Sequence, residues 1–201
     1  MKKKIFIFYF CFKFLFLSIN PSYSFISLNC SDTISAAITI QQTCQNNDTL
    51  IITNVGSVIL TGSDAVDADS KSGVTIDNKG TISASVNQAI DMQNSVNTTV
   101  TNSGTIEAGQ INAILMDGTS ADNNTINNSG TLKAGKTQVI LATNSENTTI
   151  INSGSIETTN SSNPNTSGIN YYNTSASAID GATITNTGTI FAYGAGIRFG
   201  T

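Results

Sequence analysis

The sequence predicts an all-β fold, a right-handed parallel β-helix (solenoid) of about six coils with an N-terminal cap. Three observations predict it. A phrase built around Asn-x-Gly occurs six times, with glycines at Gly56, Gly80, Gly104, Gly130, Gly154 and Gly188. When the repeats are aligned on these glycines, apolar residues fall into columns and alternate with polar residues, which is typical of strands with one buried face. No window shows convincing helical periodicity.

Residues 1–24 have the features of an export signal, which we expect to be removed from the mature chain. Three lysines at positions 2–4 precede an apolar run from Ile5 to Ile19, and Ser22-Tyr23-Ser24 supplies the small residues that a signal peptidase reads. The apolar run is shorter than the roughly 20 residues that span a bilayer. We predict that the mature chain begins near Phe25, with an uncleaved N-terminal anchor as the alternative.

Charge excludes several classes of partner. The chain has 9 Lys and Arg residues and 13 Asp and Glu residues, and four of the lysines lie in the signal. The mature chain therefore carries 5 basic against 13 acidic residues, a formal charge of -8. Such a surface repels nucleic acid, whose binding depends on Lys and Arg neutralising phosphates. It also repels anionic membrane surfaces.

Residues 25–49 lack the Asn-x-Gly phrase, and we predict that they form the N-terminal cap, with Ile38 and Ile40 in its strand. This segment contains Cys30 and Cys44, and an exported chain with two cysteines is able to pair them. On the loop-entropy model such a short loop gives a stabilisation of about 3 kcal/mol. Two free thiols are the alternative.

Residues 50–201 form the predicted coils, each with three short strands. Three strands in one repeat cannot bury their inward face alone, so the coils stack in parallel, with equivalent residues about 4.8 Å apart. The usual hand of parallel crossovers makes the solenoid right-handed. The main apolar columns stand four residues before, two after and four after the glycines and, in the first four repeats, ten after, as in Ile76, Ile82, Ala84 and Ile90 or Val100, Ile106, Ala108 and Ile114. We expect the C-terminal end to be open, because the sequence stops within the third strand of the sixth coil.

One asparagine precedes each glycine by two positions, and we predict that these side chains stack into a structural ladder. Asparagine tolerates a left-handed backbone, and its amide bonds to neighbouring backbone groups. The following glycine would permit the bend into the next strand. A row that binds a ligand is the alternative. The predicted ladder residues are Asn54, Asn78, Asn102, Asn128, Asn152 and Asn186.

The fifth repeat is ten residues longer than the usual 24, and the stretch Thr158–Asn173 reads as a loop at one corner. The third strand is expected to resume near Gly168–Asn170 or near Ala178-Ile179. Loops that interrupt a regular scaffold often carry recognition. Tyr171 and Tyr172 therefore make this stretch the best candidate contact site, with a neutral surface insertion as the alternative.

An export signal followed by tandem T-[IV]-x-N-x-G-[TS]-[IL] coils resembles the passenger domains of bacterial autotransporters. The resemblance covers about residues 25–201, and the first copy departs from it with Ile51 and Val58. Autotransporters of this kind end in a membrane β-barrel that carries the passenger across the outer membrane, and this sequence has no such segment. We therefore expect either that the sequence belongs to a longer chain or that the protein is released or displayed by other means.

The residues offer little recognisable chemistry. The sequence has no histidine, so it lacks the commonest general base and metal ligand. Asp67 and Asp91 are expected at the same place on adjacent coils. Two carboxylates about 5 Å apart suit a retaining glycosidase, and with Asp64 and Asp69 they suit calcium. Leucine takes this position in the next two coils, so we predict a solvated turn and assign no catalytic, cofactor or metal residue.

Two hypotheses for function follow. The first is a structural and adhesive role, in which a stiff exported rod presents loops to surface glycans or proteins at or beyond the cell surface. The second is a β-helical lyase or hydrolase acting on polysaccharide. Fold alone cannot choose between them.

Overall fold

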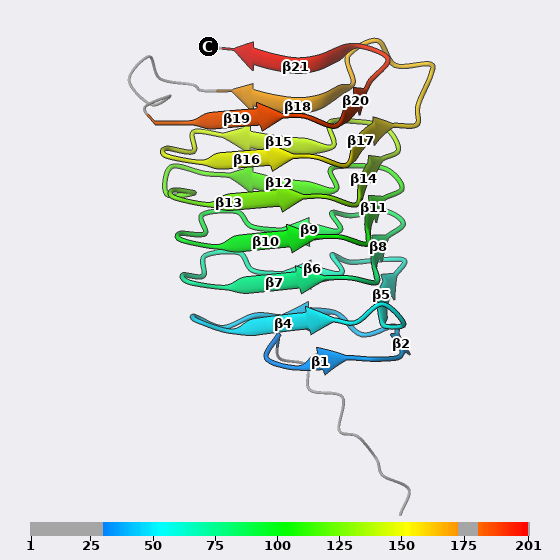
Figure 1. The fold of residues 1–201 in the computed structure, drawn as a ribbon, viewed down its shortest axis with the longest axis vertical. Coiled ribbons are helices and arrows are strands. Elements are labelled where there is room, and N and C mark those ends of the chain that lie inside the picture. The colour runs from blue at the N-terminus through cyan, green and yellow to red at the C-terminus, as the bar shows by residue number, and fades with distance from the viewer. Residues whose placement is uncertain (1–29, 173–180, 201) are drawn as a thin grey trace, which may run out of the picture.

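The computed structural model describes residues 30–172 and 181–200, and within them the chain forms a parallel β-helix with no α-helix. The predicted export signal, residues 1–24, lies outside the described residues, as does Ala178-Ile179, one of the two predicted places for the displaced strand. Each coil contributes one strand to each of three parallel sheets. Figure 1 shows the coils stacked along one axis, with the first sheet facing the viewer and the second edge-on at the right. First-sheet strands such as β7 (Thr75–Asn78) run left to right in front, and third-sheet strands such as β12 (Ile114–Asp117) run right to left behind as the chain rises, so the spiral is right-handed (Figure 1).

The strands of each sheet follow one another at intervals of three along the chain. The first sheet contains β1 (Thr33–Ile34), β4 (Thr49–Ile52), β7 (Thr75–Asn78), β10 (Thr99–Asn102), β13 (Thr125–Asn128), β16 (Thr149–Asn152) and β19 (Thr183–Asn186). The second contains β2 (Ala37–Ile38), β5 (Ser57–Leu60), β8 (Thr81–Ala84), β11 (Thr105–Ala108), β14 (Thr131–Ala134), β17 (Ser155–Thr158) and β20 (Thr189–Phe191). The third contains β3 (Gln42–Thr43), β6 (Val66–Asp67), β9 (Ile90–Asp91), β12 (Ile114–Asp117), β15 (Ile140–Thr143), β18 (Ser167–Tyr172) and β21 (Ala195–Gly200).

The segment predicted as a cap is itself a short coil. Its strands β1, β2 and β3 pair in parallel with β4, β5 and β6, so all three sheets begin within residues 33–43. Ile38 is buried in β2 as expected, whereas Ile40 lies outside the strands and is only partly buried. Six further coils follow, one for each Asn-x-Gly phrase.

The predicted columns form the core. Ile82, Ile106 and Leu132 pair in register on successive strands of the second sheet and are fully buried. In the third sheet Ile90 and Ile114 do the same. β-Branched and aliphatic side chains of this kind suit a pleated surface with one buried face, and here they meet side by side along the axis of the rod.

The first copy of the repeat is displaced by two residues in the first sheet. The sequence alignment put Ile52 below Ile76, but in the structure Leu50 pairs with Ile76 and Ile52 pairs with Asn78. The reason is a longer connection between β4 and β5, which leaves Val55 70% exposed in the turn. The register is restored at β5, where Val58 pairs with Ile82.

The repeat glycines lie at the first corner, between the first and second sheets. The structural reason for glycine there differs from the predicted one. The repeat glycines have no left-handed backbone, since positive φ among the glycines occurs only at Gly73, Gly118 and Gly181 in the described residues. What requires glycine is close stacking. A Cβ on Gly104 would lie 2.1 Å from the carbonyl oxygen of Gly80.

Left-handed residues gather instead at the third corner, where the chain passes from the third sheet to the first sheet of the next coil. One such residue lies two positions before the first residue of each first-sheet strand from β4 to β19. Backbone hydrogen bonds join these turns from coil to coil, as from the Asn97 amide to the Asp122 carbonyl. The residues and their φ angles are Asn47 (63°), Gly73 (73°), Asn97 (56°), Asn123 (55°), Asn147 (50°) and Gly181 (80°).

The ten extra residues of the fifth repeat are divided between two corners. The register pairs Thr158 with Ala134 and Ile169 with Ile140, so the path from 158 to 169 is five residues longer than that from 134 to 140. The path from Ile169 to Thr183 is also five residues longer than that from Ile140 to Thr149. The strand resumes at β18, which agrees with the first of the two predicted places. The prediction of a single loop at one corner is wrong.

The last coil exposes its inward-facing side chains. Ile197 is 38% and Phe199 60% exposed, whereas Ile169 and Tyr171, their partners on β18, are fully buried. The strands β19, β20 and β21 each have a neighbour on one side only. The last described coil therefore exposes positions that the coils before it bury.

Candidate functional site

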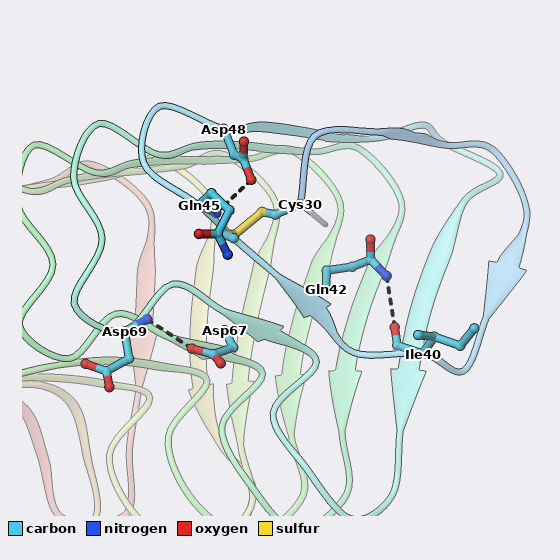
Figure 2. The surroundings of a disulfide bond; sticks show 8 residues. Cys30, Ile40, Gln42, Gln45, Asp48, Asp67 and Asp69 are labelled. Atoms are coloured by element: carbon cyan, nitrogen blue, oxygen red, sulfur yellow. Dashed lines mark hydrogen bonds between the residues drawn. A yellow bond between two sulfur atoms is a disulfide. The ribbon is translucent and has the colours of Figure 1, made fainter. Parts of the chain in front are cut away.

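The two cysteines of the first coil form a disulfide. The sulfur atoms of Cys30 and Cys44 are 2.01 Å apart, and both residues are fully buried. Figure 2 shows the bond beside the turn in which the Gln45 amide donates to a carboxylate oxygen of Asp48, at 2.7 Å. The bond ties the start of the first coil to the end of β3 and so fastens the N-terminal end of the rod.

The asparagine ladder, Asn78, Asn102, Asn128, Asn152 and Asn186, is a continuous chain of amide hydrogen bonds. The Nδ2 of Asn78 donates to Oδ1 of Asn102 at 2.7 Å, and the same bond recurs up to Asn186 at 2.6–2.8 Å. Each donor also points at the carbonyl of the glycine two residues later, as Asn102 does to Gly104 at 3.3 Å. The first four members are buried. Both ends of the inner amides are thus engaged within the fold.

Asn54 does not belong to this ladder, so that part of the prediction is wrong. It is exposed in the longer turn after β4, and Ile52 occupies the ladder position below Asn78. Isoleucine offers no amide, and the buried Oδ1 of Asn78 has no hydrogen-bond partner. The ladder members are also strand residues without positive φ, so stacking of amides, and not a left-handed turn, is the reason for asparagine here.

The two aspartates of the third sheet lie in register, as predicted. Asp67 on β6 pairs with Asp91 on β9, and both are partly buried strand residues that follow an inward-facing residue. They are not in a solvated turn, which corrects the prediction. Each carboxylate accepts a bond from a backbone amide two residues later, at 3.0 Å in both coils; Figure 2 shows this bond between Asp67 and Asp69.

Burial changes the acidity of this cluster. Desolvation raises the pKa of Asp91 from 3.8 to about 6, and the negative charges of Asp64, Asp69 and Asp67 add to the rise. The backbone bond from Gln93 opposes it. Desolvation also raises the pKa of Asp64. Near pH 6 the Asp91 carboxyl can therefore give up or accept a proton beside other carboxylates.

The acidic cluster does not extend along the sheet. Leu115 takes the corresponding position on β12 and is only 5% exposed. Within residues 30–172 and 181–200, no three His, Cys, Asp or Glu side chains are grouped so that they could hold a metal ion. What the arrangement offers chemically is a group of carboxyls on two adjacent coils, of which Asp91 and Asp64 have a raised pKa.

The two tyrosines of the inserted stretch have different environments. Tyr171 points inward, is fully buried, and its hydroxyl donates to the Ser145 carbonyl. It therefore cannot contribute to a surface contact, which corrects half of the predicted contact site. Tyr172 points outward and is 39% exposed. The predicted contact site reduces to Tyr172 and the turn of residues 159–166.

Two further aromatic residues on the last coil were missed at the level of sequence. Phe191 faces outward on β20, and Tyr193 follows it in the turn before β21. Their rings meet edge to face with centroids 5.2 Å apart, and both remain about half exposed. The alternation around Ile190 was the available signal, because it places residue 191 on the outer face.

Comparison with known proteins adds no relative: no family model, no curated protein and no solved structure matches this chain. Nor does the described part of the chain contain a helix long and apolar enough to cross a membrane.

Proposed function

We propose that this chain is an exported β-helical scaffold with a structural and adhesive role, which presents loops to glycans or proteins of a host or environmental surface. The observation that carries the proposal is that the coil of β16, β17 and β18 accepts ten additional residues without interrupting any sheet. β17 and β18 each pair in parallel with a strand of the coil before and of the coil after the insertion.

The interior supports a scaffold role, because its polar and apolar side chains contact one another from coil to coil. The asparagine ladder is buried and hydrogen-bonded to itself, and the apolar columns fill the rest of the core. Recognition therefore falls to the outer surface. The inserted turn of residues 159–166, and Tyr172 at the other end of β18, offer exposed polar and aromatic groups of the kind that bind surfaces.

The proposal extends to location. The predicted export signal and the disulfide are both typical of a protein that works at or beyond the cell surface. The passenger-like repeats favour display on the outer membrane through a translocator.

The test compares cells that display the full chain with cells that lack it, on immobilised glycans and on host cells. Removing residues 160–164 restores the usual turn length, and we expect it to reduce binding at least tenfold while the thermal midpoint stays close to that of the unaltered chain. The matched control is Val55→Thr, an exposed residue of a different corner and coil. Equal adhesion with and without the chain would refute the proposal.

The raised pKa of Asp91 favours a second candidate, a polysaccharide hydrolase or lyase. A protonated Asp91 beside the Asp67 carboxylate has the pairing that glycosidic bond cleavage uses. Here the purified mature chain would release reducing ends or unsaturated sugars from a polysaccharide, and Asp91→Asn would abolish the release. An absence of turnover on a broad panel of glycans would remove this candidate.

A further inference from the structure

The third corner of the rod contains a repeated motif that neither the ladder nor the inserted loop uses. Of the six left-handed residues that stand two positions before a first-sheet strand, four are asparagines, and each is followed two positions later by the threonine that begins the strand. None of the intervening residues is proline. These four tripeptides are Asn47-Asp48-Thr49, Asn97-Thr98-Thr99, Asn123-Asn124-Thr125 and Asn147-Thr148-Thr149.

The sequence Asn-x-Thr is the acceptor motif for N-linked glycosylation, and it requires an accessible surface position. All four asparagines of this corner row (Asn47, Asn97, Asn123, Asn147) are exposed. Their threonines lie in register on the outer face of the first sheet, for example Thr99 beside Thr125. The fold therefore repeats the acceptor and its hydroxyl along one edge of the rod, with the last three on consecutive coils about 4.8 Å apart.

The amide nitrogens of the corner row are free to react. No hydrogen bond joins the Nδ2 of these four side chains to any group in the described part of the chain. In the buried asparagine ladder the opposite holds, since Nδ2 of Asn102 donates to Asn128 and each ladder residue is followed at the second position by glycine. Two sets of asparagines thus have separate tasks: one supports the interior and lacks the motif, and the other is exposed and has it.

Other Asn-x-Ser/Thr tripeptides in the described chain fit less well. Asn127 lies within β13 and is only partly exposed. Asn165 is exposed, but Ser167, two positions later, is fully buried in β18. Asn160 already accepts a hydrogen bond at Oδ1 from the Ser162 amide.

We propose that the corner row is a line of acceptors for N-linked sugar. The donor is a hexose activated as a pyrophosphate ester, supplied by a separate transferase. The amide nitrogen forms a bond to the anomeric carbon, the bond from that carbon to the phosphate oxygen breaks, and the pyrophosphate leaves with the electron pair. The amide proton passes to a base of the transferase. This inference does not depend on the adhesive role.

The test begins with the full chain purified from the cells that naturally produce it, followed by glycopeptide mass spectrometry. We expect hexose-bearing peptides at the corner row and none at Asn78, Asn102 or Asn128 of the ladder. Unmodified asparagines throughout the row, or sugar confined to Asn160 and Asn165, would overturn the proposal.

Variants assign each sugar to its motif. Thr99→Ala should remove the modification at Asn97 alone, whereas Thr99→Ser should retain it. Thr75→Ala is the matched control, because Thr75 pairs with Thr99 in the first sheet but stands two positions after Gly73 and not after an asparagine. All four sites should stay occupied in this variant. Asn97→Gly reproduces the residue found at Gly73 and should remove the sugar without a change in thermal midpoint. Loss of occupancy at all sites in the Thr75→Ala variant would contradict the assignment.

A second experiment identifies the activated sugar that serves as the donor. Unmodified full chain from a host without such transferases is incubated with extract of the natural cells and either a nucleotide-activated hexose or a lipid-pyrophosphate hexose. Transfer to the corner row with one of the two donors supports the proposal and identifies the source. Transfer with neither donor contradicts it.

Discussion

Asn128 lies in the middle of the asparagine ladder, and both ends of its amide are engaged. It accepts from Asn102 at 2.8 Å and donates to Asn152 at 2.7 Å in a fully enclosed setting. Because buried polar groups without partners are costly, the effect of a substitution here depends on the partners left behind.

We expect Asn128→Ala to destabilise the protein by about 2 kcal/mol, since it leaves the buried Oδ1 of Asn152 without its donor. Chemical denaturation of the purified chain measures this. Asn54→Ala is the matched control, because Asn54 is exposed and outside the ladder, and it should change stability by less than about 0.5 kcal/mol. Equal losses in the two variants would show that the amide chain has no stabilising effect.

Asp91 makes the stability of the fold depend on pH. Its pKa of about 6 is above the unfolded value of 3.8, so folding favours the neutral form. The associated stability is fully present below pH 3.8 and is lost as the pH rises through about 6. Asp91→Asn keeps an acceptor for the Gln93 amide and removes the ionisation.

The Asp91→Asn variant should therefore be more stable than the unaltered chain at neutral pH and close to it near pH 4. Thermal midpoints of both proteins across this range, at constant ionic strength, measure the difference. A difference that does not vary with pH would contradict the raised pKa of Asp91.

At the scale of the element, the first corner is fixed by contact between backbones. Gly104→Ala would place a methyl group 2.1 Å from the carbonyl oxygen of Gly80, and no flexible side chain is there to move. We expect destabilisation of about 3 kcal/mol or a failure to fold. Gly62→Ala is the control, since a Cβ there meets nothing within 4 Å, and it should be neutral or slightly stabilising. Comparable denaturation midpoints for the two variants would disprove the packing argument.

The disulfide belongs to the first coil, so its loss should act locally. Replacing Cys30 and Cys44 with serine should remove about 3 kcal/mol from the stability of that coil. Hydrogen exchange is expected to accelerate in β1, β2 and β3 while β10 to β14 keep their protection, because each coil contacts only its neighbours. Uniform acceleration along the rod would contradict this expectation.

The elements also show what the sequence could and could not predict. The columns of Ile82, Ile106 and Leu132 were correct because strand alternation and a constant repeat length determine the register. The displacement around Ile52 was missed, since an alignment on Gly56 cannot reveal a longer turn between the strand and the glycine. The two-corner insertion was missed for the same reason: a length difference does not say where the residues are accommodated.

The candidate site was predictable only in part. Pairing of Asp67 with Asp91 followed from the repeat, but their partial burial depends on neighbouring turns that the pattern does not describe. The inward direction of Tyr171 followed from the register of β18, which was left open between two places.

At the scale of the whole molecule, stability should be graded along the axis. The last coil has exposed inward residues such as Ile197 and Phe199, whereas the central coils are buried. We expect the amides of β19, β20 and β21 to exchange faster than those of β10, β11 and β13, which mass spectrometry of peptides would resolve. Protection at the last coil equal to that of the centre would mean that something covers this end in solution.

The bare backbone contact at the glycine corner has a consequence for how such a protein can diversify. At each repeat glycine a Cβ would lie 2.0–2.2 Å from a carbonyl oxygen of the coil below, so these positions accept no larger residue. Extra residues are nevertheless taken up at all three corners, two of them between β4 and β5, while the sheets continue unbroken. The fixed feature of the first corner is therefore the line of glycines, and the length of each turn is what can vary.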